Sequence, residues 1–152
     1  ESLSRLQLNL SHNHISILPE SLGKLTYTTL NLSHNQLSVL PESFSPDASE
    51  LDLSHNHISI LPESLDTLTY KTLNLRHNQL SVLPESFSPR IGNGHLNLSH
   101  NQLSVLPRSF RGTLMSVSGF GGVNLANNPL PESEKDWARR CWRGKSYKLK
   151  LR

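Results

Sequence analysis

The chain has 152 residues, of which 35% are hydrophobic and 18% are charged, so it is long enough for one domain with a core of its own. It contains no apolar run near the roughly eighteen residues that a membrane-spanning helix needs, and its single cysteine, Cys141, cannot form an intrachain disulfide. The net charge of +3 is concentrated in residues 132–152, which carry eight Lys or Arg against three Asp or Glu, whereas residues 1–131 carry seven against nine. This distribution excludes the basic surface, interleaved with aromatic residues, that nucleic-acid binding requires across the main body.

A short phrase of alternating leucines recurs along the chain. Six segments match Leu-x-Leu-x-x-Asn or its valine variant, and the intervals between their asparagines are 22, 21, 22, 23 and 27 residues. Residues 8–50 and 51–93 are identical at 34 of 43 positions, which indicates duplication of a block of two turns. A fixed period of this length with this pattern is the signature of leucine-rich repeats. The six asparagines are Asn13, Asn35, Asn56, Asn78, Asn101 and Asn128.

Each phrase is predicted to form one short strand. Alternate leucines point to one face of such a strand, and one strand cannot bury them alone, so each turn must stack on the next. The sequence therefore predicts an α/β solenoid, a right-handed superhelix with a parallel concave β-sheet, a mostly irregular or 3-10 convex side and a C-terminal capping helix. The strands are expected at residues 7–12, 29–34, 50–55, 72–77, 95–100 and 122–127.

The six asparagines are predicted to be structural. Each turns inward where its strand ends, and its amide can satisfy backbone groups that the turning chain would leave unpaired. A Leu-Pro pair begins five residues after each of the first five and directs an extended chain to the convex side. There "ESLGKLTY" and "ESLDTLTY" have room for a short helical or 3-10 turn, whereas "ESFSPDASE" and "ESFSPRIGN" contain an interior proline and suit irregular segments. Convex structure should therefore alternate from turn to turn.

The chain closes with a predicted cap. Residues 111–122 form a glycine-rich insertion, after which "VNLANN" resumes the repeat. The segment "PLPESEKDWARRCWRGK" is typical of a helix, with acidic residues in its first turn and arginines in its last. Trp137 and Trp142 are expected to be largely buried against the last turn, and "YKLKLR" alternates like a short strand. Residues 1–131 thus form the solenoid, and residues 132–152 form the capping helix and a short basic tail.

Three columns of polar side chains are expected on the concave face, because the residues between the leucines point away from the core. One column is mainly asparagine, and a second is mainly serine with Arg76 as its one charged member. The third is a row of five histidines, His12, His34, His55, His77 and His100, which Asn127 closes; this set of five is called the histidine row below. The side chains expected to meet a protein partner are Asn9, His12, Asn31, His34, Asp52, His55, Asn74, Arg76, His77, Asn97 and His100.

The role of the histidine row stays open between three alternatives. It is a polar row copied by duplication, a protein-binding surface, or a metal site. Adjacent strands lie about 4.8 Å apart, so the rings should stack, and protonation of neighbours should lower some pKa values and reduce stability in acid. A one-dimensional row offers no tetrahedral closure, so we expect no metal and no cofactor. No catalytic set is present, since the serines beside the histidines have no orienting acid other than Asp52, and this chain is not expected to be an enzyme.

The phrasing "LPESL…LNLSHNQLSVLPESF" resembles the short leucine-rich repeats of bacterial effector proteins. The end, "LPRSF…VNLANNPLPESEKDW", resembles the last repeat and capping helix of effectors of the bacterial novel E3 ubiquitin ligase class, and the resemblance covers residues 6–137. In that class the repeats recognise host proteins, and a separate C-terminal ligase domain carries its catalytic cysteine in a Cys-x-Asp motif. Cys141 is followed by Trp142 and Arg143, so a ligase activity could belong only to a longer parent protein.

The resemblance implies a domain that recognises host proteins and is secreted by a bacterium into the host cytoplasm. The alternative is an intracellular, cytoplasmic scaffold or adaptor with neither an effector nor a ligase role. The chain starts at Glu1 without an initiator methionine or a secretory signal, and we expect it to be a fragment. Its expected partner is a protein on the concave face, with no nucleic acid and no membrane, and the chain itself is expected to be a monomer.

Overall fold

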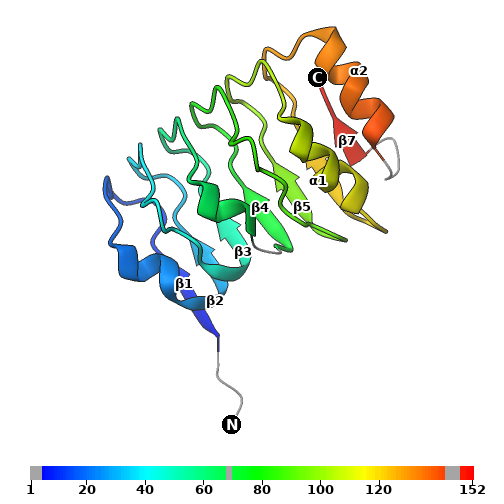
Figure 1. Ribbon diagram of the computed structural model, residues 1–152. Coiled ribbons are helices and arrows are strands. Elements are labelled where there is room, and N and C mark those ends of the chain that lie inside the picture. The colour runs from blue at the N-terminus through cyan, green and yellow to red at the C-terminus, as the bar shows by residue number, and fades with distance from the viewer. Residues whose placement is uncertain (1–4, 68–69, 143–147) are drawn as a thin grey trace.

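One parallel sheet runs the length of the molecule. The computed structural model describes residues 5–67, 70–142 and 148–152. Seven strands in this part of the chain pair side by side in chain order, all of them parallel, as the colour gradient of Figure 1 shows. The predicted solenoid is thereby confirmed. The strands are β1 (Leu6–Asn9), β2 (Thr26–Asn31), β3 (Asp47–Asp52), β4 (Thr72–Asn74), β5 (His95–Asn97), β6 (Gly122–Asn124) and β7 (Leu149–Lys150).

The strands overlap the predicted segments but end three residues earlier. Strand pairing places Asn31 opposite Asp52, and Asp52 opposite Asn74, so the equivalent residues of successive turns are in register. Backbone hydrogen bonding between turns continues beyond the strand ends, since the His34 N–H donates to the Ser54 carbonyl at 3.0 Å. The histidines therefore still belong to the bonded ladder, as the sequence predicted, although the regular strand conformation has stopped.

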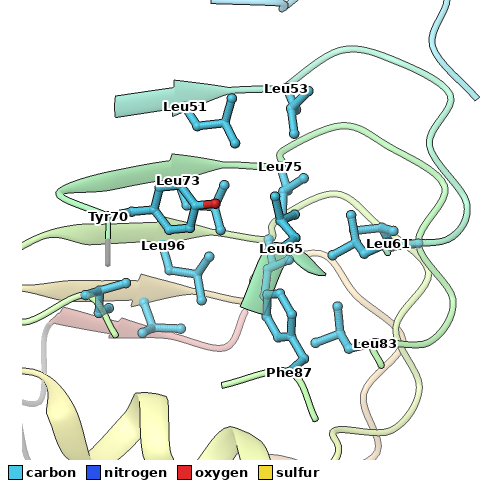
Figure 2. Packing of buried hydrophobic residues seen from close by; sticks show 14 of the residues in the cluster. Leu51, Leu53, Leu61, Leu65, Tyr70, Leu73, Leu75, Leu83, Phe87 and Leu96 are labelled. Atoms are coloured by element: carbon cyan, nitrogen blue, oxygen red, sulfur yellow. The ribbon is translucent and has the colours of Figure 1, made fainter. Parts of the chain in front are cut away.

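The core is built from the leucines that the strands direct inward. Figure 2 shows Leu51, Leu73 and Leu96 one below another on adjacent strands. Each of them is 0–1% exposed. Residues of the convex side close the core from the opposite direction, including Phe87, whose ring lies 6.1 Å from that of Phe110. Burial of each leucine contributes roughly 1.5–3 kcal/mol to stability. A turn buries its leucines fully only when a neighbouring turn covers them.

The structural asparagines form a continuous hydrogen-bonded ladder between the turns. In a typical turn the Asn56 amide donates to the carbonyls of Leu53, in its own turn, and Leu32, in the preceding one, at 3.1 and 3.0 Å. Its Oδ1 atom accepts the N–H of Leu37 at 3.0 Å. The same three contacts recur at Asn35, Asn78, Asn101 and Asn128, whereas the exposed Asn13 bonds only within its own turn. Each of the five asparagines after Asn13 thus joins two successive turns.

The convex side alternates as the sequence predicted over the first four turns. Short 3-10 helices, η1 (Glu20–Lys24) and η2 (Glu63–Thr67), occupy the first and third turns, and the segments around Pro46 and Pro89 are irregular. The fifth turn holds η3 (Arg108–Phe110) and α1 (Arg111–Ser116), and this helix in the glycine-rich insertion was not predicted. Its own residues Thr113 and Leu114 are buried, which explains why a segment without strong helix signals is helical. Within the described residues, no helix has the length and apolar character needed to cross a membrane.

A helix and a strand close the C-terminal end, at the upper right of Figure 1. The predicted closing helix is α2 (Glu132–Cys141), and β7 pairs with β6 where the alternation of "YKLKLR" predicted a strand. Trp137 and Trp142, which were predicted to be largely buried, are partly buried and pack against the core at this end. The fully buried residues of the helix are Glu134, Ala138 and Cys141, and Trp137, three residues after Glu134 and four before Cys141, borders the same face.

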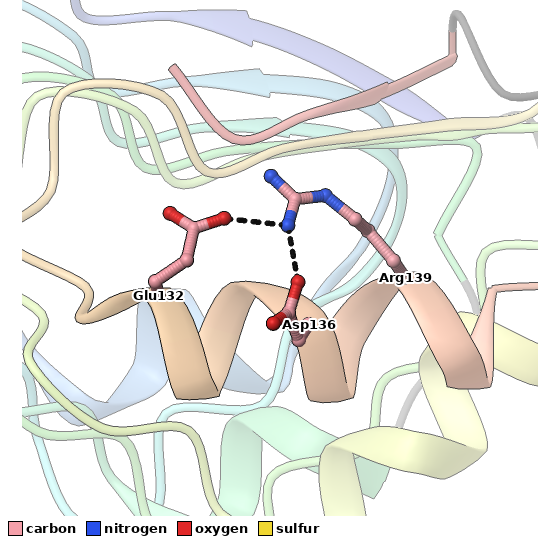
Figure 3. Close-up of polar contacts among 3 residues, drawn as sticks. All are labelled: Glu132, Asp136 and Arg139. Atoms are coloured by element: carbon pink, nitrogen blue, oxygen red, sulfur yellow. Dashed lines mark hydrogen bonds and ion pairs between the residues drawn. The ribbon is translucent and has the colours of Figure 1, made fainter.

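Two sets of charged contacts hold the cap. Glu134 accepts the Leu106 N–H at 2.9 Å and pairs with Arg108 at 2.7 Å, and the Arg108 guanidinium lies 4.3 Å from the centre of a Trp137 ring. On the outer face, Arg139 contacts Glu132 at 2.7 Å and Asp136 at 2.6 Å (Figure 3). These two carboxylates raise the pKa of Arg139. The first set joins the helix to the fifth turn, whereas the second lies within the helix itself.

Candidate functional site

The side chains of the asparagine column on the concave face form hydrogen bonds with their own backbone. At each position of this column, the side-chain Oδ1 atom accepts a hydrogen bond from the backbone N–H two residues later. In the second turn the Ser33 N–H donates to Oδ1 of Asn31 at 3.0 Å, and the Ser33 hydroxyl donates to the same atom at 2.7 Å. This is the Asx turn by which Asn and Asp bond their own backbone. The sequence analysis missed this second role. The column is Asn9, Asn31, Asp52, Asn74, Asn97 and Asn124, and the contact recurs at all six.

The second column is mostly out of reach of a partner. Ser33, Ser54 and Ser99 are buried between neighbouring turns, whereas Arg76, which stands at the same position of the fourth turn, is exposed. Asp52 in the first column comes from the adjacent third turn. These two residues carry the only charged side chains among the twelve positions of the first and second columns, all of which the structure describes.

The histidine row forms the stack that the repeat predicted. Successive ring centroids from His12 to His100 lie 4.2, 4.2, 4.4 and 4.1 Å apart, with interplanar angles of 10°, 9°, 22° and 14°. These separations are shorter than the strand spacing of about 4.8 Å, so successive rings are in stacking contact. The Asn127 amide continues the row, with Nδ2 3.0 Å from Nε2 of His100.

Every residue of the row has a left-handed backbone. The five histidines have φ between +54° and +56°, and Asn127 has φ of +58°. Non-glycine residues seldom adopt this conformation, and Asn, Asp and His are enriched among those that do. This conformation lies three residues after the end of each strand and leads to the inward-facing asparagine. The recurrence of His or Asn just before each structural asparagine was the available signal, and the sequence analysis did not use it.

The Leucine Rich Repeat family model matches five segments of the chain, residues 6–25, 28–46, 49–68, 71–89 and 95–113. Together they cover more than half of its length. The chain belongs to the leucine-rich-repeat family. Leucine-rich-repeat domains generally bind protein partners and are generally non-catalytic. A comparison with curated proteins finds no match. The sixth turn lies beyond the matched segments, yet β6 and Asn128 repeat the geometry of the others.

The stacked rings of the histidine row in this leucine-rich-repeat protein cannot direct their nitrogen atoms at one metal ion. Nearly parallel rings direct their nitrogen lone pairs in parallel, whereas a metal site needs them aimed at a common point. In the part of the chain that the structure describes, no group of three or more His, Cys, Asp or Glu could hold a metal ion. His14, His57 and His95 lie apart from the row and are exposed. What the row can offer is a line of imidazole edges that donate or accept hydrogen bonds.

His55 and His77, in the middle of the histidine row, are harder to protonate than a free histidine. Partial burial lowers the pKa of His55, and the neighbouring charges of His34, Arg76 and His100 lower it further, against an opposing effect of Asp52. Partial burial likewise lowers the pKa of His77, with contributions from His100, His55 and Arg76. Both side chains are therefore held neutral to lower pH than a free histidine.

This shift predicts a loss of stability in acid. An unfolded histidine has a pKa near 6.5, so below that value the unfolded chain binds protons that folded His55 and His77 still exclude. The free energy of unfolding should be intact above about pH 6.5 and should fall as the pH drops from there through the lower pKa values of the folded state. Urea unfolding at pH 7.5 and at pH 5 measures this fall.

The matched variant is His55→Asn with His77→Asn, because asparagine occupies this backbone conformation naturally at Asn127. Removing two adjacent titrating rings should make the fall between pH 7.5 and pH 5 smaller than in the wild type. Two charges about 4 Å apart repel by on the order of 1 kcal/mol in water and less in salt, which sets the expected size. Equal acid sensitivity of the two proteins would show that the row does not set the pH dependence.

Proposed function

We propose that the chain is a protein-recognition module and that its partner binds the concave face. The observation that carries the proposal is the pair of charged departures from the repeat, Asp52 and Arg76. The repeat places asparagine or a small residue at these positions, and neither charge is needed for the stacking of the turns. They come from adjacent turns at the centre of the histidine row, where a concave partner would be held.

The finer proposal concerns the parent protein. The phrasing of the repeats and of the closing helix supports a host-protein recognition domain of a secreted bacterial effector, belonging to an E3 ubiquitin ligase parent. The second candidate is an intracellular scaffold or adaptor. The full coding sequence distinguishes them: a secretion leader before residue 1 and a domain with a Cys-x-Asp motif after residue 152 support the effector, and their absence supports the scaffold. In either case we propose that the chain acts as a monomer and contacts neither nucleic acid nor membrane.

The test of the binding face uses substitutions that restore the repeat. The variant Asp52→Asn with Arg76→Ser gives both positions the residues found in the other turns, so its fold should be preserved. The matched control Lys24→Thr also restores the residue of the duplicated block, since Thr67 is its counterpart, but it lies on the convex side. Each protein is cross-linked in extracts of a candidate host, and the affinity for the recovered partner is then measured with purified proteins.

We expect Asp52→Asn with Arg76→Ser to weaken partner binding by about tenfold or more, equivalent to about 1.4 kcal/mol, and Lys24→Thr to leave it unchanged. Weakening should come mainly from loss of charge complementarity, so it should be largest at low salt. Equal binding of the partner to the double variant and to the wild type would place recognition away from the concave face. Loss of binding in Lys24→Thr alone would do the same.

A further inference from the structure

A row of exposed aliphatic side chains lies outside the concave face. One residue before each Leu-Pro pair, every one of the first five turns carries an isoleucine or valine whose side chain is open to solvent. Single exposed apolar residues are ordinary, but a contiguous row of large ones marks an interaction site. We call this set the apolar stripe; it comprises Ile17, Val39, Ile60, Val82 and Val105, with exposed fractions of 82%, 67%, 66%, 49% and 46%.

The apolar stripe has a regular spacing. Three residues before each stripe residue of turns two to five, a backbone N–H donates to a carbonyl of the preceding turn, as from Gln36 to Ile15 at 2.9 Å and from His57 to Leu37 at 2.8 Å. The turns are therefore still bonded close to the stripe, so we expect its members to keep nearly the strand spacing of about 4.8 Å. Between them the surface is hollowed. A depression of about 650 Å³ lies between Ile60 and Val82, and another of about 200 Å³ lies between Val82 and Val105.

A row of carboxylates borders the apolar stripe. A glutamate follows the Leu-Pro pair in each of the first four turns, and Glu42, Glu63 and Glu85 line the larger depression together with the stripe residues. All of these glutamates are exposed, and none forms a salt bridge with another described residue. In the fifth turn Arg108 takes this position, where it pairs with Glu134 of the cap. This negative row runs beside the first four stripe residues: Glu20, Glu42, Glu63 and Glu85.

We propose that the apolar stripe is a second docking surface, which binds an amphipathic helix with a basic border from a partner protein. A helix advances about 5.4 Å per turn, so apolar side chains at i, i+4 and i+7 can follow successive stripe residues. An extended segment repeats its side chains about every 6.6 Å and loses this match after one or two turns. Lysines or arginines on one border of the helix would meet the glutamate row, whereas the same row repels an anionic membrane surface.

The test uses two synthetic helical peptides as probes. Each has roughly eighteen residues, which form about five helical turns, with leucines at i, i+4, i+7 and i+11. One carries lysines on a border of the leucine face, and the other carries glutamates at the same positions. Binding to the isotope-labelled full chain is followed by fluorescence anisotropy and by amide chemical shifts in NMR spectra. The lysine peptide should bind, should shift amides along the apolar stripe, and should bind more weakly as salt is raised.

Substitutions separate the apolar and the charged contributions. Val39→Ser with Ile60→Ser and Val82→Ser changes only exposed side chains, so it should fold, and it should weaken the lysine peptide by about tenfold or more. Glu42→Gln with Glu63→Gln and Glu85→Gln should also weaken it and should remove most of the salt dependence. Met115→Ser is the control, because this exposed apolar side chain on α1 lies off the stripe, and it should leave the affinity unchanged.

Several results would overturn the proposal. Failure of the lysine peptide to bind, equal binding of the glutamate peptide, or full binding by the triple serine variant would each do so. Shifts confined to the histidine row would move the peptide to the concave face. Self-association of the wild-type chain that the triple serine variant abolishes would assign the stripe to a second copy instead of a basic helix. None of these results depends on the concave partner, so the two proposals fail independently.

Discussion

Replacement of Asn56 by alanine is expected to lower the free energy of unfolding by about 3 kcal/mol. The side chain is buried in the middle of the asparagine ladder, and its removal leaves the Leu37 N–H without an acceptor. The carbonyls of Leu32 and Leu53 each keep a second amide donor from an adjacent asparagine. The substitution therefore leaves one buried donor unpaired, removes the three hydrogen bonds that the Asn56 amide donates, and adds a small cavity. Urea unfolding at pH 7.5 measures the change.

The control for this experiment is Asn13→Ala. Asn13 begins the ladder, is exposed and accepts no N–H from another turn, so its loss should change the free energy of unfolding by less than about 1 kcal/mol. Because the two substitutions are chemically identical, the difference between them isolates the contribution of bonding between turns. Equal effects at the two positions would mean that the asparagines act only within their own turns.

Truncation after Asn128 should be the most damaging single change. It removes α2 and β7, and with them the buried side chains of Leu130 and Leu151 and the carboxylate that accepts the Leu106 N–H. Burial of the two leucines alone contributes roughly 3–6 kcal/mol, which corresponds to a fall of about 10 °C or more in Tm. Calorimetry and size-exclusion chromatography should show early melting and aggregation, because the last turn exposes its leucines.

A point substitution tests the same cap within the full chain. Ala138→Glu forces a charge into a position that is 0% exposed, and it should also lower Tm strongly. Arg139→Ala is the matched control on the outer face of the same helix, where exposed ion pairs contribute little and Tm should stay near the wild-type value. A truncated chain that melts like the wild type as a soluble monomer would show that the cap is dispensable.

The repeating parts of the molecule could be predicted because each prediction was made six times over. The period located the strands, the asparagine ladder and the stacked histidines, and their geometry follows from strand spacing and from the alternation of side chains. The alternating convex side was predictable from Pro46 and Pro89, since a proline inside a short segment interrupts helical hydrogen bonding.

The remaining features depend on contacts that no period encodes. Trp137 and Trp142 were predicted as the buried residues of the cap, whereas the fully buried side chains of α2 include Glu134, which the Leu106 N–H and Arg108 hold there. Helix α1 forms because the fifth turn buries Thr113 and Leu114, which the insertion sequence alone does not indicate. The apolar stripe was overlooked for a related reason. Alternating apolar residues such as Ile15 and Ile17 look equally suited to a core, and only the path of the chain shows that the second faces solvent.

The left-handed backbone shared by the histidine row and Asn127 limits how the concave face can evolve. Most L-residues lose about 1–2 kcal/mol in this conformation, whereas glycine, asparagine and aspartate adopt it at lower cost. Mutational drift along the row should therefore move among histidine, asparagine, aspartate and glycine, and valine or isoleucine should be disfavoured whatever the ligand. A change of specificity would be reached more readily through positions such as Asp52 and Arg76, where φ is not positive and the choice of side chain is wider.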